Sequence, residues 1–75
     1  MNLEEFIENF ADQFDETDVN DIQAETKFHN LEEWSSLVAL GVIAMAKIQY
    51  GKVITGKEIR ECETVEDLFN IIASK

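Results

Sequence analysis

Apolar residues near the start of the chain recur at intervals of three and four positions, at Leu3, Phe6, Ile7, Phe10, Ala11 and Phe14. This spacing places them on one face of an amphipathic helix. Asn2 is a suitable N-cap, and acidic residues at positions 4 and 5 suit the positive end of the helix dipole. The pattern therefore predicts a helix over 3–14 whose three phenylalanines belong to the core.

A longer apolar run covers residues 37–46, where ten consecutive positions carry no polar side chain. It predicts a second helix from about Ser36 to Tyr50, capped by Ser35 or Ser36 and ended by Gly51 as the C′ residue. A helix that is apolar nearly all round is either buried on several sides or presents apolar surface to a partner. Two stripes follow its turns: Leu37, Leu40, Ala44 and Ile48 form one, and Val38, Val42 and Met45 form the other. We expect the Leu37 stripe to pack inward and part of the Val38 stripe to stay accessible beside the serines.

The segment from Asp15 to Trp34 contains neither glycine nor proline. Because a structureless loop of this length is unusual in a compact domain, we expect its apolar residues to hold it against the core, with a short helical turn near 19–24. Extended residues at 53–54, a short third helix over 56–62 and a last helix over 65–73, capped by Thr64, complete the pattern. Residues 1–75 are therefore predicted to form a single all-α domain. It is a four-helix bundle with a short third helix and a long loop between helices one and two.

Charge is distributed unevenly over the chain, whose net charge is −10. Residues 1–36 contain eleven acidic residues and one basic residue, whereas residues 37–75 contain five of each. Nucleic-acid binding is disfavoured, because it requires a basic face. An acidic surface favours basic partners, although it also serves simply to keep a small protein in solution. The start of the chain lacks the pattern of a secretory signal, and the apolar run is half of the roughly 20 residues that span a bilayer. We therefore expect a cytoplasmic monomer without a membrane span.

Candidate catalytic and metal-binding residues are few. The single cysteine, Cys62, excludes an internal disulfide and gives no metal-ligand spacing, so we expect a partly buried thiol. His29 is the only histidine, and a triad with Ser35 or Ser36 can be drawn, but a lone histidine on a polar loop is more typical of an exposed side chain. The aspartates at 15, 18 and 21 do not follow a calcium-loop pattern. We therefore predict no catalytic residue and no metal site.

Four short motifs, taken in order, resemble the acyl carrier protein family over most of the chain. Residues 26–31 match a T-x-F-x-x-L approach, and 34–37 read W-S-S-L where members of the family have W-D-S-L, so that Ser35 stands at the aspartate position. Residues 50–54 (Y-G-K-V-I) resemble F-G-x-x-I, and residues 64–68 (T-V-E-D-L) resemble T-V-x-D-L. The resemblance implies that the four helices form a bundle of the acyl-carrier-protein type.

The same resemblance implies a function in which Ser36, with Ser35 as second choice, carries 4′-phosphopantetheine. A phosphopantetheinyl transferase would donate this arm from coenzyme A. The arm's thiol would hold an acyl or aminoacyl group as a thioester for loading and using enzymes in lipid, polyketide or nonribosomal peptide biosynthesis. The carrier itself would not be an enzyme. The residues expected to dock on partners are Trp34, Ser35, Leu37, Val38 and Val42.

Helix two carries no acidic residue, which favours a docking mode with more apolar contact. Two alternatives stay open: an unmodified interaction module that binds a partner through helix two, and a small acidic regulator of a basic protein.

Overall fold

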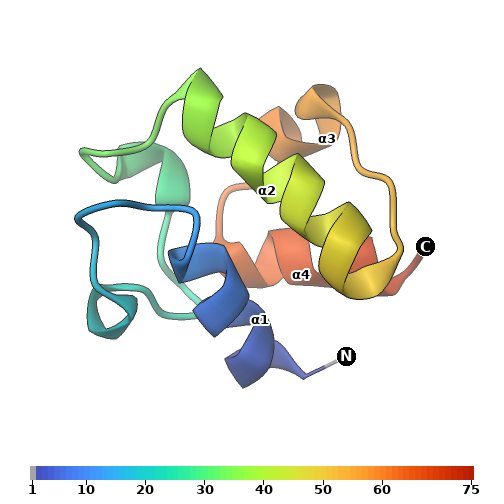
Figure 1. The fold of residues 1–75 in the computed structure, drawn as a ribbon, viewed down its shortest axis with the longest axis horizontal. Helices are drawn as coiled ribbons and strands as arrows, with labels where there is room; N and C mark the ends of the chain where they lie inside the picture. The colour runs from blue at the N-terminus through green and yellow to red at the C-terminus, as the bar shows by residue number, and fades with distance from the viewer. Residues whose placement is uncertain (1) are drawn as a thin grey trace.

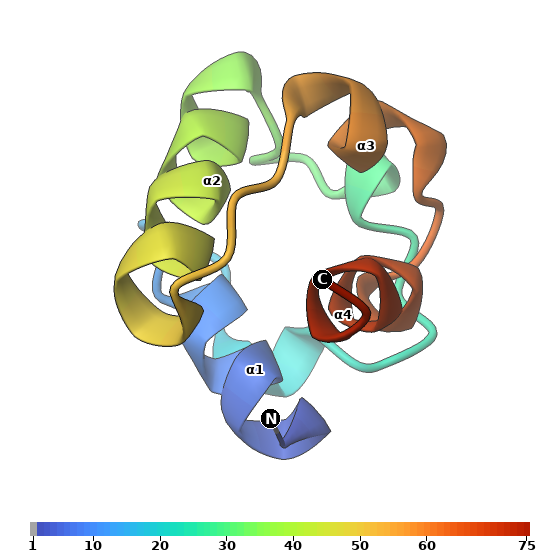
Figure 2. The ribbon, with the colours of Figure 1, turned by 90° about the vertical axis from the view of Figure 1, so that its right-hand side faces the viewer.

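Four α-helices and no strand make up the regular structure of residues 2–75, which is the part of the chain that the computed structural model describes. The helices are α1 (Leu3–Ala11), α2 (Ser36–Tyr50), α3 (Gly56–Glu61) and α4 (Val65–Ala73), with 3-10 turns η1 (Val19–Asp21) and η2 (Phe28–Asn30) between α1 and α2. α2 crosses the molecule diagonally (Figure 1), and the four helices surround a common interior (Figure 2). The predicted all-α class is thus confirmed. No helix among these residues is long and apolar enough to cross a membrane.

The helix predicted over residues 3–14 is one turn shorter in the structure. α1 is capped by Asn2, whose side chain accepts the Glu5 N–H at 3.1 Å, and it ends at Ala11. A tight turn follows, in which the Gln13 N–H donates to the carbonyl oxygen of Phe10 and the Phe14 N–H donates to the carbonyl oxygen of Ala11, each three residues back. The phenylalanines at 6, 10 and 14 are all buried, as predicted. The apolar spacing therefore continues beyond the end of the helix itself.

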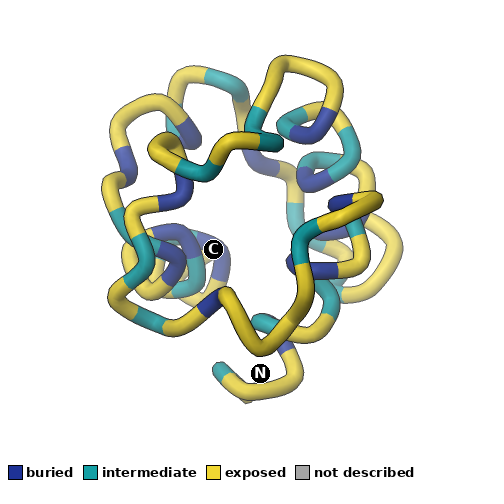
Figure 3. Tube along the Cα trace, turned by 90° about the vertical axis from the view of Figure 1, so that its left-hand side faces the viewer, coloured by how far each residue is buried: buried dark blue, intermediate teal, exposed yellow. Residues whose placement is uncertain are grey.

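The two stripes of α2 have the opposite placement to the one predicted. Val38 and Val42 are 9% and 0% exposed and pack in the core, whereas Leu37 and Leu40 are 78% and 63% exposed. Met45 and Ala46 continue the buried stripe, and Ala44 and Ile48 continue the exposed one. The prediction was wrong because residues on both faces are apolar, so the sequence pattern does not reveal which side meets the other helices. Figure 3 colours the chain trace by burial, and the buried positions lie mostly on the side of the trace that faces the centre of the molecule.

An aromatic cluster in the core holds the segment that leads into α2. The Trp34 ring lies 4.8 Å from the Phe28 ring in an edge arrangement and stacks on Phe10 with centroids 6.2 Å apart. Phe10 also contacts Phe14 and Phe28. Aromatic pairs at these distances add to the burial of their area. They fix Trp34, and therefore the position of the serines that follow it.

One carboxylate also holds the predicted long loop between α1 and α2. Glu33 accepts the backbone N–H groups of Asp15, Glu16 and Thr17 at 2.7–3.2 Å, and also the Thr17 hydroxyl at 2.8 Å. The Thr17 hydroxyl, and then the loop amides, hold the pKa of Glu33 below its ordinary value of 4.5, although desolvation opposes them. The two ends of the loop are thereby joined just before α2 begins.

Candidate functional site

The two serines at the start of α2 have different structural roles. Ser35 is the N-cap, and its hydroxyl oxygen accepts the Val38 N–H at 3.3 Å. Ser36 is the first helical residue; it is exposed, and its hydroxyl has no hydrogen-bond partner within residues 2–75. The N–H groups of Ser36 and Leu37 also have no acceptor in this part of the chain, as is usual in the first turn of a helix. The Ser35 hydroxyl therefore serves as the N-cap of α2, and the Ser36 hydroxyl is free.

Beside Ser36 lies an open hollow between α2 and α3, with a volume of about 560 Å³. We call it the α2–α3 hollow. Its lining consists of His29 and Trp34 from the preceding segment, Ser35, Ser36, Ala39, Leu40 and Ile43 from α2, and Gly56, Ile59 and Arg60 from α3. The volume falls within the range of small-molecule sites, roughly 300–1,000 Å³. Apolar side chains form most of the wall, and its polar members are His29, Ser35, Ser36 and Arg60.

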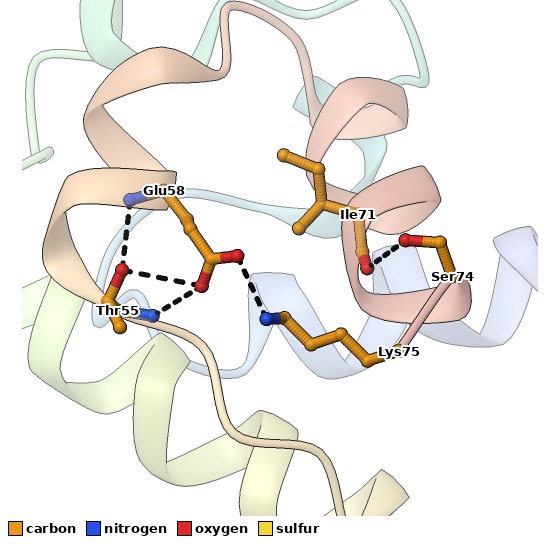
Figure 4. Close-up of polar contacts among 5 residues, drawn as sticks. All are labelled: Thr55, Glu58, Ile71, Ser74 and Lys75. Carbon is orange, nitrogen blue, oxygen red and sulfur yellow. Dashed lines mark hydrogen bonds and ion pairs between the residues drawn. The ribbon is translucent and has the colours of Figure 1, made fainter.

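The α3 wall of the hollow is fixed at its beginning by polar contacts. The Thr55 hydroxyl accepts the Glu58 N–H at 3.2 Å, and the Glu58 carboxylate accepts the Thr55 N–H at 2.9 Å, which together form a capping box. The other oxygen of Glu58 pairs with the Lys75 ammonium at 2.8 Å (Figure 4). This Lys75 hydrogen bond, followed by the Thr55 N–H, lowers the pKa of Glu58. Lys75 thus contacts Glu58 of the capping box at the start of α3.

The end of α3 is fixed by His29. Its Nε2 lies 3.1 Å from the Ile59 carbonyl oxygen and 3.0 Å from the Cys62 carbonyl oxygen. Because both partners are acceptors, Nε2 must carry the proton and donate it. The imidazole also lies against Phe28, with ring centroids 4.4 Å apart. His29 is exposed, as predicted, but the sequence did not indicate its contact with α3; its Nε2 is occupied as a donor to the backbone, which argues against a triad with the nearby serines.

The α2–α3 hollow differs in charge from the rest of this acidic chain. No aspartate or glutamate lines it, and its one cationic side chain is Arg60. Arg60 forms no ion pair within residues 2–75, where the single ion pair joins Glu58 to Lys75. A second hollow, lined by Glu16, Asp21, Glu32 and Glu33 among others, is strongly acidic. Of the two, the α2–α3 hollow is the one suited to a group that is apolar or anionic.

The expected docking residues separate into three groups. Leu37 is exposed on the outer face of α2, and Ser35 is exposed at its start. Trp34 is half-buried, contacting the aromatic cluster on one side and the α2–α3 hollow on the other. Val38 and Val42 are core residues and do not offer a surface to a partner. Sequence reasoning missed Leu40 and Ile48, which are 63% and 77% exposed and extend the outer face.

Cys62 and the acidic side chains do not form a second candidate site. The Cys62 side chain was predicted to be partly buried and is almost fully buried; burial, assisted by nearby carboxylates, raises the pKa of its thiol to about 11. Within residues 2–75, no three side chains of the His, Cys, Asp or Glu types are grouped as a metal site requires. Comparison of the chain with protein families, curated proteins and solved structures gave no match.

Proposed function

We propose that this protein is an acyl or aminoacyl carrier whose 4′-phosphopantetheine arm is attached to Ser36. The observation that carries the proposal is the free Ser36 hydroxyl at the start of α2, on the edge of a hollow that contains no carboxylate. A helix start favours an anion, because unpaired N–H groups and the helix dipole both attract negative charge. The motif resemblance to acyl carrier proteins, described above, supports the same residue.

The residues around Ser36 fit this arm chemically. A phosphodiester on the Ser36 oxygen would lie near the N–H groups of Ser36 and Leu37, and the apolar wall formed by Ala39, Ile43 and Ile59 would suit the arm or its cargo. The bound arm supplies a thiol that carries the cargo as a thioester. The chain's own residues would hold the arm at its root and shield it on one side.

The N-cap geometry favours Ser36 over Ser35 as the attachment residue. An ester on Ser35 would turn the hydroxyl oxygen that now accepts the Val38 N–H into a bridging phosphoester oxygen, which is a weaker acceptor. The cost would be at most that of losing an N-cap, about 0.5–2 kcal/mol. Modification of Ser36 leaves that hydrogen bond intact. Ser35 therefore performs the capping role that an aspartate at this position would also perform.

Partner enzymes would then meet the outer face of α2. We define this α2 outer face as Leu37, Leu40, Ala44 and Ile48. It starts next to Ser36 and continues along the helix, and the only charged residue of α2 is Lys47. The docking would therefore be chiefly apolar. This replaces the expectation that Val38 and Val42 contact partners.

Loading by a promiscuous phosphopantetheinyl transferase and coenzyme A tests the proposal directly. Wild-type protein and Ser35→Ala should gain the mass of one phosphopantetheine group, and Ser36→Ala should not. Thermal melts of the unloaded variants provide the control for folding. Modification of Ser36→Ala but not of Ser35→Ala would move the site to Ser35.

The exposed α2 outer face favours a second candidate function, that of an unmodified interaction module. In this case the protein would bind its partner without an arm. A wild-type chain that no transferase loads, together with partner binding that Leu40→Glu abolishes, would favour the interaction module over the carrier.

A further inference from the structure

Arg60 is the cationic side chain of the α2–α3 hollow, and the hollow has no carboxylate to balance it. The residue is exposed, and its guanidinium forms no ion pair within the described residues 2–75. Lys57 and the other lysines except Lys75 also form no ion pair there, but Arg60 is the one cation that lines this hollow. An anion that enters the hollow would therefore meet one cation and no carboxylate of the protein.

The Arg60 side chain lies close to Gly56. Its Nη1 would lie 3.5 Å from a Cβ atom placed at Gly56, so the guanidinium extends back along α3 over a glycine that also lines the hollow. The backbone around Arg60 is held by His29, which donates to the carbonyl of the preceding residue, Ile59. Lys57 belongs to the same short helix and carries the same charge, but it does not line the hollow.

We propose that Arg60 binds the phosphodiester on Ser36 and so holds the root of the arm against α3. This inference rests on the proposed carrier function. Guanidinium N–H groups would donate charge-assisted hydrogen bonds to the non-bridging phosphate oxygens. The phosphate is the anion to expect here, because its attachment to Ser36 fixes it at the same hollow, whereas a carboxylate on the cargo would lie at the far end of a flexible arm. Arg60 is thus a positioning residue for the arm.

The test compares loaded and unloaded protein in matched variants. Wild type, Arg60→Gln, Arg60→Lys and Lys57→Gln are each loaded with coenzyme A by a promiscuous transferase, and intact mass verifies the loading. Each variant is then melted with and without the arm. The two glutamine variants lose the same charge from the same helix, so that only the lining position differs between them.

The quantity measured is the melting temperature of the loaded form minus that of the unloaded form. For wild type and Lys57→Gln it should exceed the value for Arg60→Gln by roughly 2–5 °C, as for an exposed ion pair in a domain of this size. Arg60→Lys should retain part of this excess, and 1 M NaCl should reduce it. Equal values for Arg60→Gln and Lys57→Gln would overturn the role of Arg60 and leave the carrier function intact. Failure of wild type to load would overturn the carrier function, and this inference with it.

Discussion

The reversed faces of α2 give a quantitative prediction about stability. Val42→Ala is a smaller truncation than Leu40→Ala, but it should lower the free energy of unfolding more. Val42→Ala removes two methyl groups from a side chain that is 0% exposed. At about 0.8 kcal/mol per buried carbon, and with a cavity term of similar size, the loss is about 2–3 kcal/mol. Leu40→Ala removes three carbons from a side chain that is 63% exposed, and it should change stability by about 0.5 kcal/mol or less.

Thermal and urea unfolding, followed by circular dichroism, measure this difference. A domain of this size loses about 4–8 °C of melting temperature per kcal/mol, so Val42→Ala should melt roughly 10–20 °C lower and Leu40→Ala within roughly 4 °C of wild type. Stability for 75 residues is on the order of 4–11 kcal/mol, so the Val42 variant should still fold. A large loss for Leu40→Ala with little change for Val42→Ala would show that the Leu37 stripe is the buried one, and would remove the α2 outer face from the account.

Three further predictions concern the loop, the thiol and the N-cap. Glu33→Gln should destabilise the protein at pH 7, because an amide replaces one of the acceptor oxygens. The folded pKa of Glu33 is lowered, so its contribution is complete above the unfolded pKa and is lost as pH falls through the folded pKa. Urea titrations of wild type and variant should therefore differ at neutral pH and converge only once the pH is below the folded pKa of Glu33. Cys62, with its thiol pKa raised to about 11, should react with a disulfide reagent slowly at pH 8 and rapidly in urea; equal rates would contradict its burial. Ser35→Asp should keep the N-cap and add an anion at the helix start, so transferase loading should become faster without loss of melting temperature. Equal or slower loading would show that the carboxylate does not assist loading of this chain.

Local signals in the sequence predicted most of the fold. α2 and α4 begin and end where the pattern placed them, because their limits depend on nearby caps: Ser35 and Thr64 at the starts, and Gly51, with φ of 66°, at the end of α2. The early end of α1 was not predicted, since Phe14 continues the apolar spacing from a tight turn. Thr55 as the cap of α3 was also missed, although the T-x-x-E spacing of a capping box is visible at 55–58.

The remaining features depend on contacts between distant residues. Glu33 joins amides sixteen to eighteen positions away, and His29 donates to carbonyls thirty and thirty-three positions away. No local pattern indicates such pairs. The sequence directed attention to Ser36 through its motif, but the division of roles between Ser35 and Ser36, and the placement of Arg60 in the same hollow, follow only from the packing of α3 beside α2.

Intact-mass analysis of the protein purified from its native cell tests the central claim most directly. The carrier function predicts a species heavier than the chain by one phosphopantetheine group, with or without an acyl or aminoacyl cargo, and peptide mapping should place the addition on Ser36. Mild thiol treatment should remove any cargo and leave the arm in place. An unmodified mass in every growth condition, from a chain whose Ser36 remains free, would contradict the carrier function.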